Sequence, residues 1–207
     1  MTTRIDILLF DGFDELDAIA PFEVFENAAG VGADCDVSLV TLDRQDRVTA
    51  SHGLKIGTDG RLADPEAENA PDVLVVPGGG WSSDEIQGVR REYDAATIPD
   101  AVAAHHATGA TVASVCTGAM LLERAGVLGD GPATTHQSAI EDLRAAGVTV
   151  PDNRIVDSGQ ILTAGGVTSG LDLALYMVKR QFGETIADEV ATVMEYEASD
   201  DILVRRG

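Results

Sequence analysis

Short apolar runs alternate with amphipathic stretches along this chain. Residues 73–76 form a near-continuous apolar run, as in a central parallel strand, and residues 111–115 form a second, β-branched run. In other stretches, apolar residues alternate with polar ones or recur at the spacing of one helix face. The expected strands are residues 4–10, 36–42, 73–76, 111–115, 133–135, 154–157 and 160–164, with a hairpin in 48–56. The expected helices are residues 14–27, 100–108, 118–124, 138–146, 171–182 and 186–196.

Strands that alternate with helices predict an α/β fold. The expected architecture is a doubly wound, mostly parallel sheet with helices on both faces, a flavodoxin-like three-layer sandwich. A chain of 207 residues is long enough for one full core, so we expect a single domain over residues 1–207. Ligands of such sheets bind beyond the carboxyl ends of the strands.

Cys116 lies where the run 111–115 meets the expected helix 118–124. A strand that turns into a helix at a residue with small neighbours is typical of a nucleophile elbow, and Gly118 leaves room for the crowded turn. Unpaired N–H groups and the helix dipole stabilise a thiolate, so we expect the pKa of Cys116 to fall. The alternative is a structural cysteine, because free cysteine packs as a small hydrophobe.

The charge balance is strongly acidic. The 14 basic and 35 acidic residues give a net charge of -21, which argues against nucleic acid or an anionic membrane as a partner. A hydrophobic content of 44% argues against a disordered acidic chain. The balance resembles the acidic surface of proteins from extreme halophiles, where molar salt screens self-repulsion.

Cysteine use and the apolar pattern bear on the compartment. Cys35 and Cys116 are the only cysteines, and nothing indicates a disulfide framework or a Cys/His metal site. There is no signal-peptide pattern at the start and no apolar stretch long enough to span a bilayer. We therefore expect a reducing, cytoplasmic location.

Residues with reactive or hydrogen-bonding groups follow several of the expected strands. The turn 78–80, Cys116 and His136 come directly after strands, and Asp17 lies one helical turn beyond another. Because the carboxyl ends of parallel strands meet at one edge of a sheet, we expect these residues to converge there.

Several longer motifs stand in a recognisable order. They are 9–13 (LFDGF), 16–17 (LD), 21–25 (PFEVF), 76–79 (VPGG), 115–119 (VCTGA), 133–136 (ATTH) and 163–170 (TAGGVTSG). At these residues the chain resembles the ThiJ/PfpI superfamily, which shares the class I glutamine amidotransferase-like fold. Within it, the chain is most similar to the isocyanide hydratases and to the amidase-like domains of some transcription regulators.

The resemblance implies roles for individual residues. Cys116 is the implied nucleophile, and Asp17 is the implied general acid and base beside it; many glyoxalase-like relatives carry glutamate at that place. Gly78 and Gly79 match the family's oxyanion-binding turn, and Thr117 is expected to help position the substrate. The plainer interpretation of Asp17 is a surface acid or helix cap, and glycines at a strand end are common in tight turns.

Other residues leave alternatives open. His136 has either a supporting role or a structural one, since the branches with a Cys–His pair place histidine directly after the cysteine, where this chain has Thr117. Asp14 and Glu15 are expected to be solvated first-turn acids. The segment 81–93 is a candidate pocket wall, although Trp81 also fits a core or interface anchor.

The resemblance implies an enzyme that hydrates an isocyanide to an N-substituted formamide, a lyase reaction on a small electrophile. It needs no metal and no organic cofactor, and the protein is expected to form a homodimer. Glyoxalase or deglycase-like activity on reactive carbonyls is an alternative. Two further alternatives are a non-enzymatic redox sensor or stress protein whose Cys116 becomes oxidised, and a ligand-binding regulatory domain.

Overall fold

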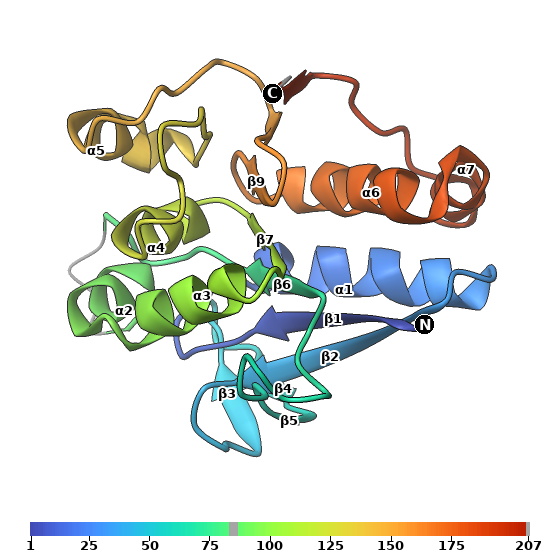
Figure 1. Ribbon diagram of the computed structural model, residues 1–207, viewed down its shortest axis with the longest axis horizontal. Helices are drawn as coiled ribbons and strands as arrows, with labels where there is room; N and C mark the ends of the chain where they lie inside the picture. The colour runs from blue at the N-terminus through green and yellow to red at the C-terminus, as the bar shows by residue number, and fades with distance from the viewer. Residues whose placement is uncertain (83–86, 206–207) are drawn as a thin grey trace.

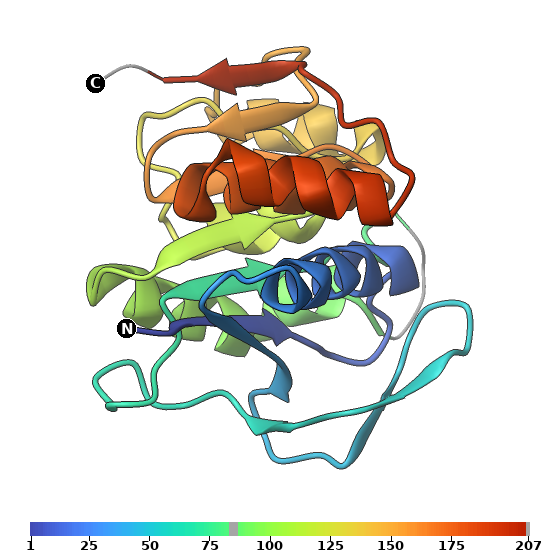
Figure 2. The ribbon, with the colours of Figure 1, turned by 90° about the vertical axis from the view of Figure 1, so that its right-hand side faces the viewer.

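The computed structural model describes residues 1–82 and 87–205 (Figure 1). Within these residues, eight strands form one sheet in the order β10-β8-β9-β7-β6-β1-β2-β5. Figure 2 shows them in succession, from the red β10 at the top to the blue β1 and β2 below. The strands are β1 (Thr3–Leu8), β2 (Cys35–Thr41), β5 (Gly60–Arg61), β6 (Val73–Val76), β7 (Thr111–Ser114), β8 (Ile155–Asp157), β9 (Ile161–Ala164) and β10 (Ile202–Val204).

The sheet is mostly parallel, as predicted. β8 runs antiparallel to β9, and β10 pairs parallel with β8, while the other neighbouring strands of the sheet pair in parallel. β3 (Arg47–Thr49) and β4 (Lys55–Gly57) form a separate antiparallel hairpin, which confirms the hairpin expected within residues 48–56.

Helices cover both faces of the sheet (Figure 1). α1 (Glu15–Gly30), α6 (Ser169–Phe182) and α7 (Glu184–Val193) pack together on one side. α2 (Val89–Ala95), α3 (Thr97–Ala107) and α4 (Gly118–Arg124) pack together on the other, where α5 (Ile140–Ala145) and the 3-10 turn η1 (Gln137–Ala139) also lie. The doubly wound three-layer architecture is confirmed.

The order in which the chain adds strands to the sheet changes direction at β1. After β1, the chain adds β2 and β5 on one side, and it then returns to add β6 on the other side. In doubly wound sheets such a switch point forms a crevice at the carboxyl ends of the strands. Asp17 lies on the helix after β1, Gly78 follows β6 and Cys116 follows β7. The topology therefore brings these three residues to the same edge of the sheet.

Some local predictions were wrong. Residues 133–135 form no strand, because their N–H groups bond outside a ladder: Ala133 N donates to the Thr149 carbonyl and Thr134 N to Thr163 Oγ1. The two-residue turn between β8 and β9 lies at residues 159–160, one residue later than predicted, because Ser158 N donates to the Ile161 carbonyl at 2.9 Å and Asp157 lies opposite Leu162. The elements β5, α2 and β10 were not predicted.

Pro21 lies inside α1 without ending it. Proline has no N–H, so the helical hydrogen bond to the carbonyl of Asp17, four residues earlier, is missing. The ring packs where α1 meets α6, and a Cβ at Gly170 would lie 3.3 Å from Pro21 Cδ. Asp17 thus lies one helical turn before this contact of α1 with α6.

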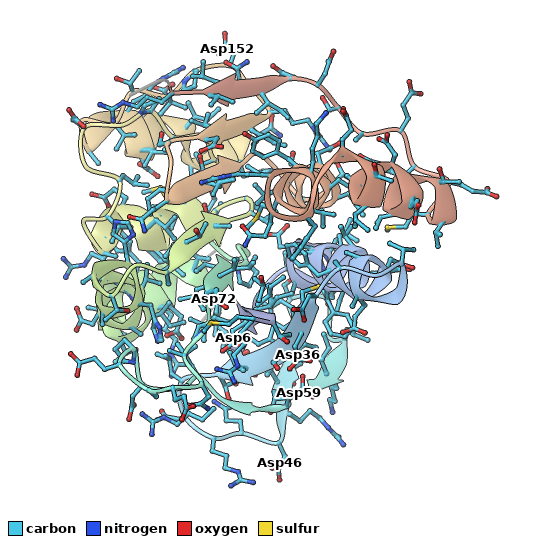
Figure 3. All side chains as sticks on the ribbon, turned by 45° about the vertical axis from the view of Figure 1, so that its right-hand side comes forward. Asp6, Asp36, Asp46, Asp59, Asp72 and Asp152 are labelled. Carbon is cyan, nitrogen blue, oxygen red and sulfur yellow. The ribbon has the colours of Figure 1, made fainter. Side chains whose placement is uncertain are left out.

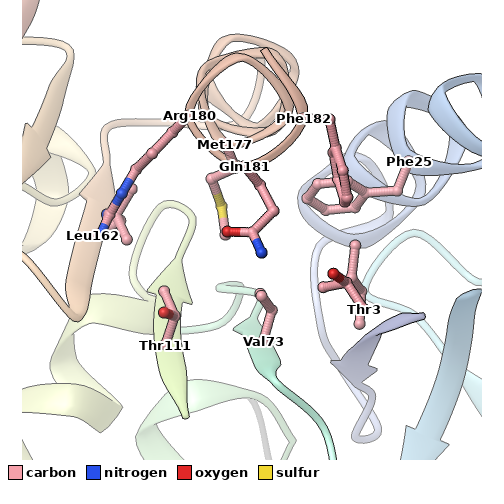
Figure 4. Close-up of a pocket in the computed structure, with 10 residues that line it drawn as sticks. Thr3, Phe25, Val73, Thr111, Leu162, Met177, Arg180, Gln181 and Phe182 are labelled. Carbon is pink, nitrogen blue, oxygen red and sulfur yellow. The ribbon is translucent and has the colours of Figure 1, made fainter. Parts of the chain in front are cut away.

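A small cavity lies at the opposite end of the strands from Cys116 (Figure 4). It measures about 40 Å³ and is lined where β1, β6 and β7 begin and by the C-terminal part of α6. Thr3, Val73 and Thr111 supply its floor, and Met177 and Phe182 its cover. This volume holds only a few water molecules and is far below the roughly 300–1,000 Å³ of ligand pockets.

Aspartates crowd together on the edge of the sheet. Asp6, Asp36 and Asp59 lie on or beside β1, β2 and β5 (Figure 3), and they share one polar cleft. Burial raises the pKa of Asp6 to about 6, and the negative charge of Asp36 adds to the rise. Such crowding is an unfavourable interaction that salt can weaken.

We expect the melting temperature to rise by roughly 5–10 °C between 0.1 M and 2 M KCl, because screening removes a few kcal/mol of repulsion at a net charge of -21. Thermal unfolding followed by circular dichroism measures this, with sucrose as an uncharged stabiliser for comparison. A melting temperature that is unchanged or lower in KCl would contradict the halophilic interpretation.

No helix in the described residues combines the length and the apolarity needed to cross a bilayer.

Candidate active site

Cys116 sits in a sharp turn between β7 and α4. Its φ is +58°, a left-handed conformation that is uncommon for a residue with a side chain. Its backbone N–H donates to the Gly165 carbonyl at 2.8 Å, which ties the turn to the segment after β9. At Gly118 a Cβ would lie 2.4 Å from the Val76 carbonyl oxygen, so only glycine permits this approach. These are the features of a nucleophile elbow.

The structure brings the Asp17 side chain next to Cys116. Asp17 is fully buried, and its Oδ2 accepts a 2.9 Å hydrogen bond from the Gly78 N–H. Its Oδ1 is buried without a hydrogen bond of ordinary geometry in the described part of the chain, and the Cys116 side chain interacts with the same carboxyl group. A thiol and a carboxyl group therefore share one water-poor space.

Burial dominates the ionisation of both groups. It raises the pKa of Asp17 to about 8, the charge of Asp14 adds to the rise, and hydrogen bonds from Gly78 and Cys116 oppose it. Burial also raises the pKa of Cys116 to about 12, the charge of Asp17 adds, and the backbone N–H groups of Val167 and Thr117 act in the opposite direction. The expected fall in the pKa of Cys116 is therefore wrong, because desolvation outweighs the N–H donors.

The two groups titrate as a coupled pair because they interact directly. The pair gives up one proton near pH 8 and holds the second until near pH 12. Between these values one proton serves both the Cys116 sulfur and the Asp17 carboxyl. Two backbone N–H groups act on the sulfur and one on the carboxyl, so the site can stabilise negative charge on either.

Val167 is a site residue that sequence reasoning missed. Its φ is +36°, which is strained for a β-branched side chain, and its backbone N–H is directed at the Cys116 sulfur. Val167 belongs to the motif 163–170, but no periodicity or turn signal marks a valine for the left-handed region. Only the motif itself pointed to this segment.

Gly78 and Gly79 lie in the site, but their N–H groups are already engaged. Gly78 N donates to Asp17 Oδ2, and Gly79 N donates to Thr117 Oγ1 at 2.9 Å. A Cβ at Gly78 would lie 2.5 Å from Thr117 N, so the two turns touch at their backbones. The family resemblance implied that this turn faces a developing oxyanion. In this conformation they instead hold the side chains of Asp17 and Thr117.

Comparison with known proteins places the fold in a family. The model of the DJ-1/PfpI family matches residues 3–180. The chain belongs to the DJ-1/PfpI family. It is 32% identical over 198 residues to the isonitrile hydratase of Pseudomonas putida, covering 95% of this chain and 79% of the relative. It is 25% identical over 194 residues to protein DJ-1 homolog A of Arabidopsis thaliana, covering 93% of this chain and 46% of that protein.

Solved structures agree with the fold of this DJ-1/PfpI protein. Drosophila melanogaster DJ-1beta superposes with a TM-score of 0.81 at 22% identity, covering 95% of this chain and all of that one. A ThiJ/PfpI family protein from Pseudomonas syringae superposes with a TM-score of 0.80 at 25% identity, covering 96% and 77% of the two chains. Proteins with different names and roles share this architecture, so the reaction has to be argued from the site.

His136 caps η1 in this DJ-1/PfpI chain. Its Nδ1 accepts from Ser138 N at 3.2 Å and lies 2.8 Å from Ser138 Oγ. Its ring covers Gly166, where a Cβ would come within 2.5 Å of His136 Cδ2. The described residues contain no hydrogen bond from its ring to Cys116, although the neighbouring Thr135 Oγ1 donates to the Cys116 carbonyl at 2.9 Å. This geometry favours the structural alternative, and a supporting role stays a prediction.

The two acids at the start of α1 are not simply solvated, contrary to the prediction. Asp14 is the N-cap, and its Oδ1 accepts from Leu16 N at 3.2 Å. Glu15 accepts from Ser51 Oγ, from His52 N and Nδ1, and from Leu54 N. Burial acts to raise the pKa of Glu15, but the hydrogen bonds from the His52 side chain and from the backbone N–H groups of Glu15, His52 and Leu54 together outweigh it and lower the pKa to about 2. Glu15 thus fastens the β3–β4 hairpin to α1.

Trp81 is a packing anchor. It is 5% exposed, and its Nε1 donates to Asp142 Oδ2 at 2.7 Å. The guanidinium of Arg90 lies 3.5 Å from the ring centroid, and Tyr93 packs edge-on with centroids 5.3 Å apart. Residues 83–86 of the predicted pocket wall 81–93 lie outside the described residues.

Proposed function

We propose that this protein adds water to the terminal carbon of an isocyanide, also called an isonitrile, and releases an N-substituted formamide. The observation that carries the proposal is the buried pair of Cys116 and Asp17, which can supply a sulfur nucleophile and a proton at the same carbon. The similarity to an isonitrile hydratase over most of the chain supports it.

The reaction balances with these two groups. In the form of the pair that holds one proton, the Cys116 sulfur bonds to the terminal carbon and that proton passes through Asp17 to the same carbon, which gives a thioimidate. Water then adds to the carbon while the Asp17 carboxylate accepts its proton. Asp17 then gives this proton to the substrate nitrogen. The carbon–sulfur bond breaks as the hydroxyl oxygen forms the formamide carbonyl, and the hydroxyl proton returns to the pair as its single proton.

The engaged glycine N–H groups favour this chemistry over carbonyl chemistry. Attack on an aldehyde or ketone develops negative charge on oxygen, which enzymes stabilise with free N–H donors. Here the N–H groups of Gly78, Gly79 and Cys116 donate to protein oxygens. Attack on an isocyanide develops the charge on carbon, where the Asp17 proton is delivered, and the first step needs no oxyanion site.

A redox-sensing role fits the site less well. Oxidation to sulfenic acid proceeds from an exposed thiolate of low pKa. Cys116 is 5% exposed, and burial raises the pKa of its thiol to about 12. Both features slow reaction with peroxide.

The test is product analysis with a simple aromatic isocyanide. We expect the protein to form the matching formamide, detected by chromatography and mass spectrometry, and Cys116→Ala to abolish it. Cys35→Ala is the matched control and is expected to keep full activity, since Cys35 lies at the start of β2. No formamide from the parent protein, or undiminished turnover by Cys116→Ala, would overturn the proposal. Lactate from methylglyoxal would instead favour the glyoxalase alternative.

The homodimer implied by the family resemblance also stays a proposal. Sedimentation equilibrium measures it: a mass of twice 21.6 kDa is expected, and a monomer at micromolar protein would contradict it.

A further inference from the structure

A second cluster, made of two carboxylates and one imidazole, lies beside the candidate active site. Asp14 and Glu15 begin α1, and His52 lies in the loop that joins β3 to β4. One ligand atom from each of the three residues lies within 4.8 Å of the others. No spacing motif reveals this group, because Glu15 and His52 are 37 residues apart in sequence.

The donor set matches that of a metal site. An imidazole nitrogen with two carboxylate oxygens suits Zn²⁺ and similar transition metals, whereas Mg²⁺ and Ca²⁺ prefer oxygen alone. Three protein ligands leave a fourth position for water. The net charge of -21 favours binding of any cation, so the imidazole is what makes the site selective.

Glu15 is held in position before any ion binds. Its Oε1 accepts from His52 N at 2.8 Å, and its Oε2 lies 3.1 Å from Ser51 Oγ and 2.7 Å from His52 Nδ1. Its side chain is 18% exposed, so little rotational freedom remains to be lost on binding. A metal ion bound between Oε2 and Nδ1 would replace the contacts of Nδ1 with Glu15 Oε2 at 2.7 Å and with Ser51 Oγ at 3.1 Å, and it would leave the backbone contact in place.

The other two ligands can adjust. The His52 side chain is 77% exposed, which allows the small rotation that ligand distances of about 2.0–2.2 Å require. Asp14 caps α1 through Oδ1, and one of its carboxylate oxygens lies within 4.8 Å of the ligand atoms of Glu15 and His52. The positive end of the α1 dipole opposes a cation here, but two carboxylates more than compensate for its partial charge.

We propose that Asp14, Glu15 and His52 bind one Zn²⁺ or a similar transition-metal ion, which fastens the β3–β4 hairpin to the start of α1. The site is separate from Cys116 and is independent of the proposed reaction.

Equilibrium dialysis against ZnCl₂ tests the proposal. The parent is the Cys35→Ser/Cys116→Ser protein, which has no thiols to bind the metal. We expect it to retain one equivalent of Zn²⁺, and we expect Zn²⁺ but not Mg²⁺ to raise its melting temperature. His52→Ala and, separately, Glu15→Gln are expected to weaken binding at least about tenfold. Asp152→Asn, which removes an exposed acid far along the chain, is the control and is expected to bind like the parent.

Two results would overturn the proposal. One is no retained Zn²⁺ in the parent protein. The other is Zn²⁺ binding that survives His52→Ala unchanged, which would assign the metal to the acidic surface. His52→Ala decides the question if Glu15→Gln disturbs the hairpin, because His52 is largely exposed and its removal leaves the Ser51 and Leu54 contacts of Glu15 in place.

Discussion

Asp17→Asn is expected to lower kcat/KM for isocyanide hydration by about 10²–10⁴-fold, because it removes the group that delivers a proton to the substrate carbon. Asparagine keeps the shape of the side chain, and its amide oxygen can still accept from the Gly78 N–H. The loss therefore reports on proton transfer rather than on the fold. Steady-state kinetics with a simple aromatic isocyanide measures it, and a loss below about threefold would exclude Asp17 as the general acid.

The same substitution is expected to stabilise the protein at alkaline pH. The pKa of Asp17 is raised from 3.8 to about 8 in the folded state, so the folded protein keeps a proton that the unfolded chain releases. The folded state is then favoured least at high pH, and its stability falls from about pH 4 to pH 8 by roughly 1.4 kcal/mol per unit. Asp17→Asn has no such proton to lose.

Urea unfolding at pH 5, 7 and 9 measures this difference. We expect the advantage of Asp17→Asn over the parent protein to grow by roughly 2–3 kcal/mol between pH 5 and pH 7, and to level off above pH 8. Asp152→Asn controls for the loss of one negative charge from a protein of net charge -21, and its difference from the parent is expected to stay nearly flat. A flat difference for Asp17→Asn as well would mean that Asp17 has an ordinary pKa.

Asp172→Ala is expected to cost about 3 kcal/mol of folding stability and to lower the melting temperature by roughly 6–12 °C. The Asp172 side chain is 1% exposed and accepts from Arg154 Nε at 2.7 Å, from Tyr196 OH at 3.1 Å and from Ser199 N at 2.7 Å. It therefore joins the start of β8 to the segment that follows α7 and leads to β10. Alanine would leave the guanidinium of Arg154 without its carboxylate partner.

Tyr196→Phe is the matched control for this network. It removes one hydroxyl from Asp172 and keeps the ion pair, so a loss of about 1 kcal/mol is expected. Thermal and urea unfolding of both variants gives the comparison. Equal losses for Asp172→Ala and Tyr196→Phe would show that the ion pair with Arg154 contributes nothing, and the arrangement at the C-terminal segment would need another explanation.

The parts of the fold that follow from local patterns could be predicted. The elbow at Cys116 is one, since a β-branched strand, a small turn and a helix are contiguous in sequence. The strand at residues 73–76 is another, because a fully apolar run fits a central parallel strand. The parallel sheet then implied that Asp17 and Cys116 would meet at its carboxyl edge.

Features set by distant contacts could not be predicted. Asp172 lies near the start of an expected helix, and its partners Arg154, Tyr196 and Ser199 are visible only in three dimensions. The left-handed conformation of Val167 opposes the preference of a β-branched residue, so sequence propensity points away from it. The pKa of Cys116 was predicted in the wrong direction because helix donors can be recognised in a sequence, whereas the degree of burial cannot.

The central claim is that the Asp17 carboxyl, buried beside Cys116, is protonated at neutral pH and gives up its proton near pH 8. Infrared difference spectroscopy of the parent protein against Asp17→Asn observes this group directly. We expect the carbonyl stretch of one protonated carboxylic acid at pH 6.5, lost with a midpoint near pH 8. A carboxylate signal from Asp17 at pH 6.5, with no protonated band, would contradict the account.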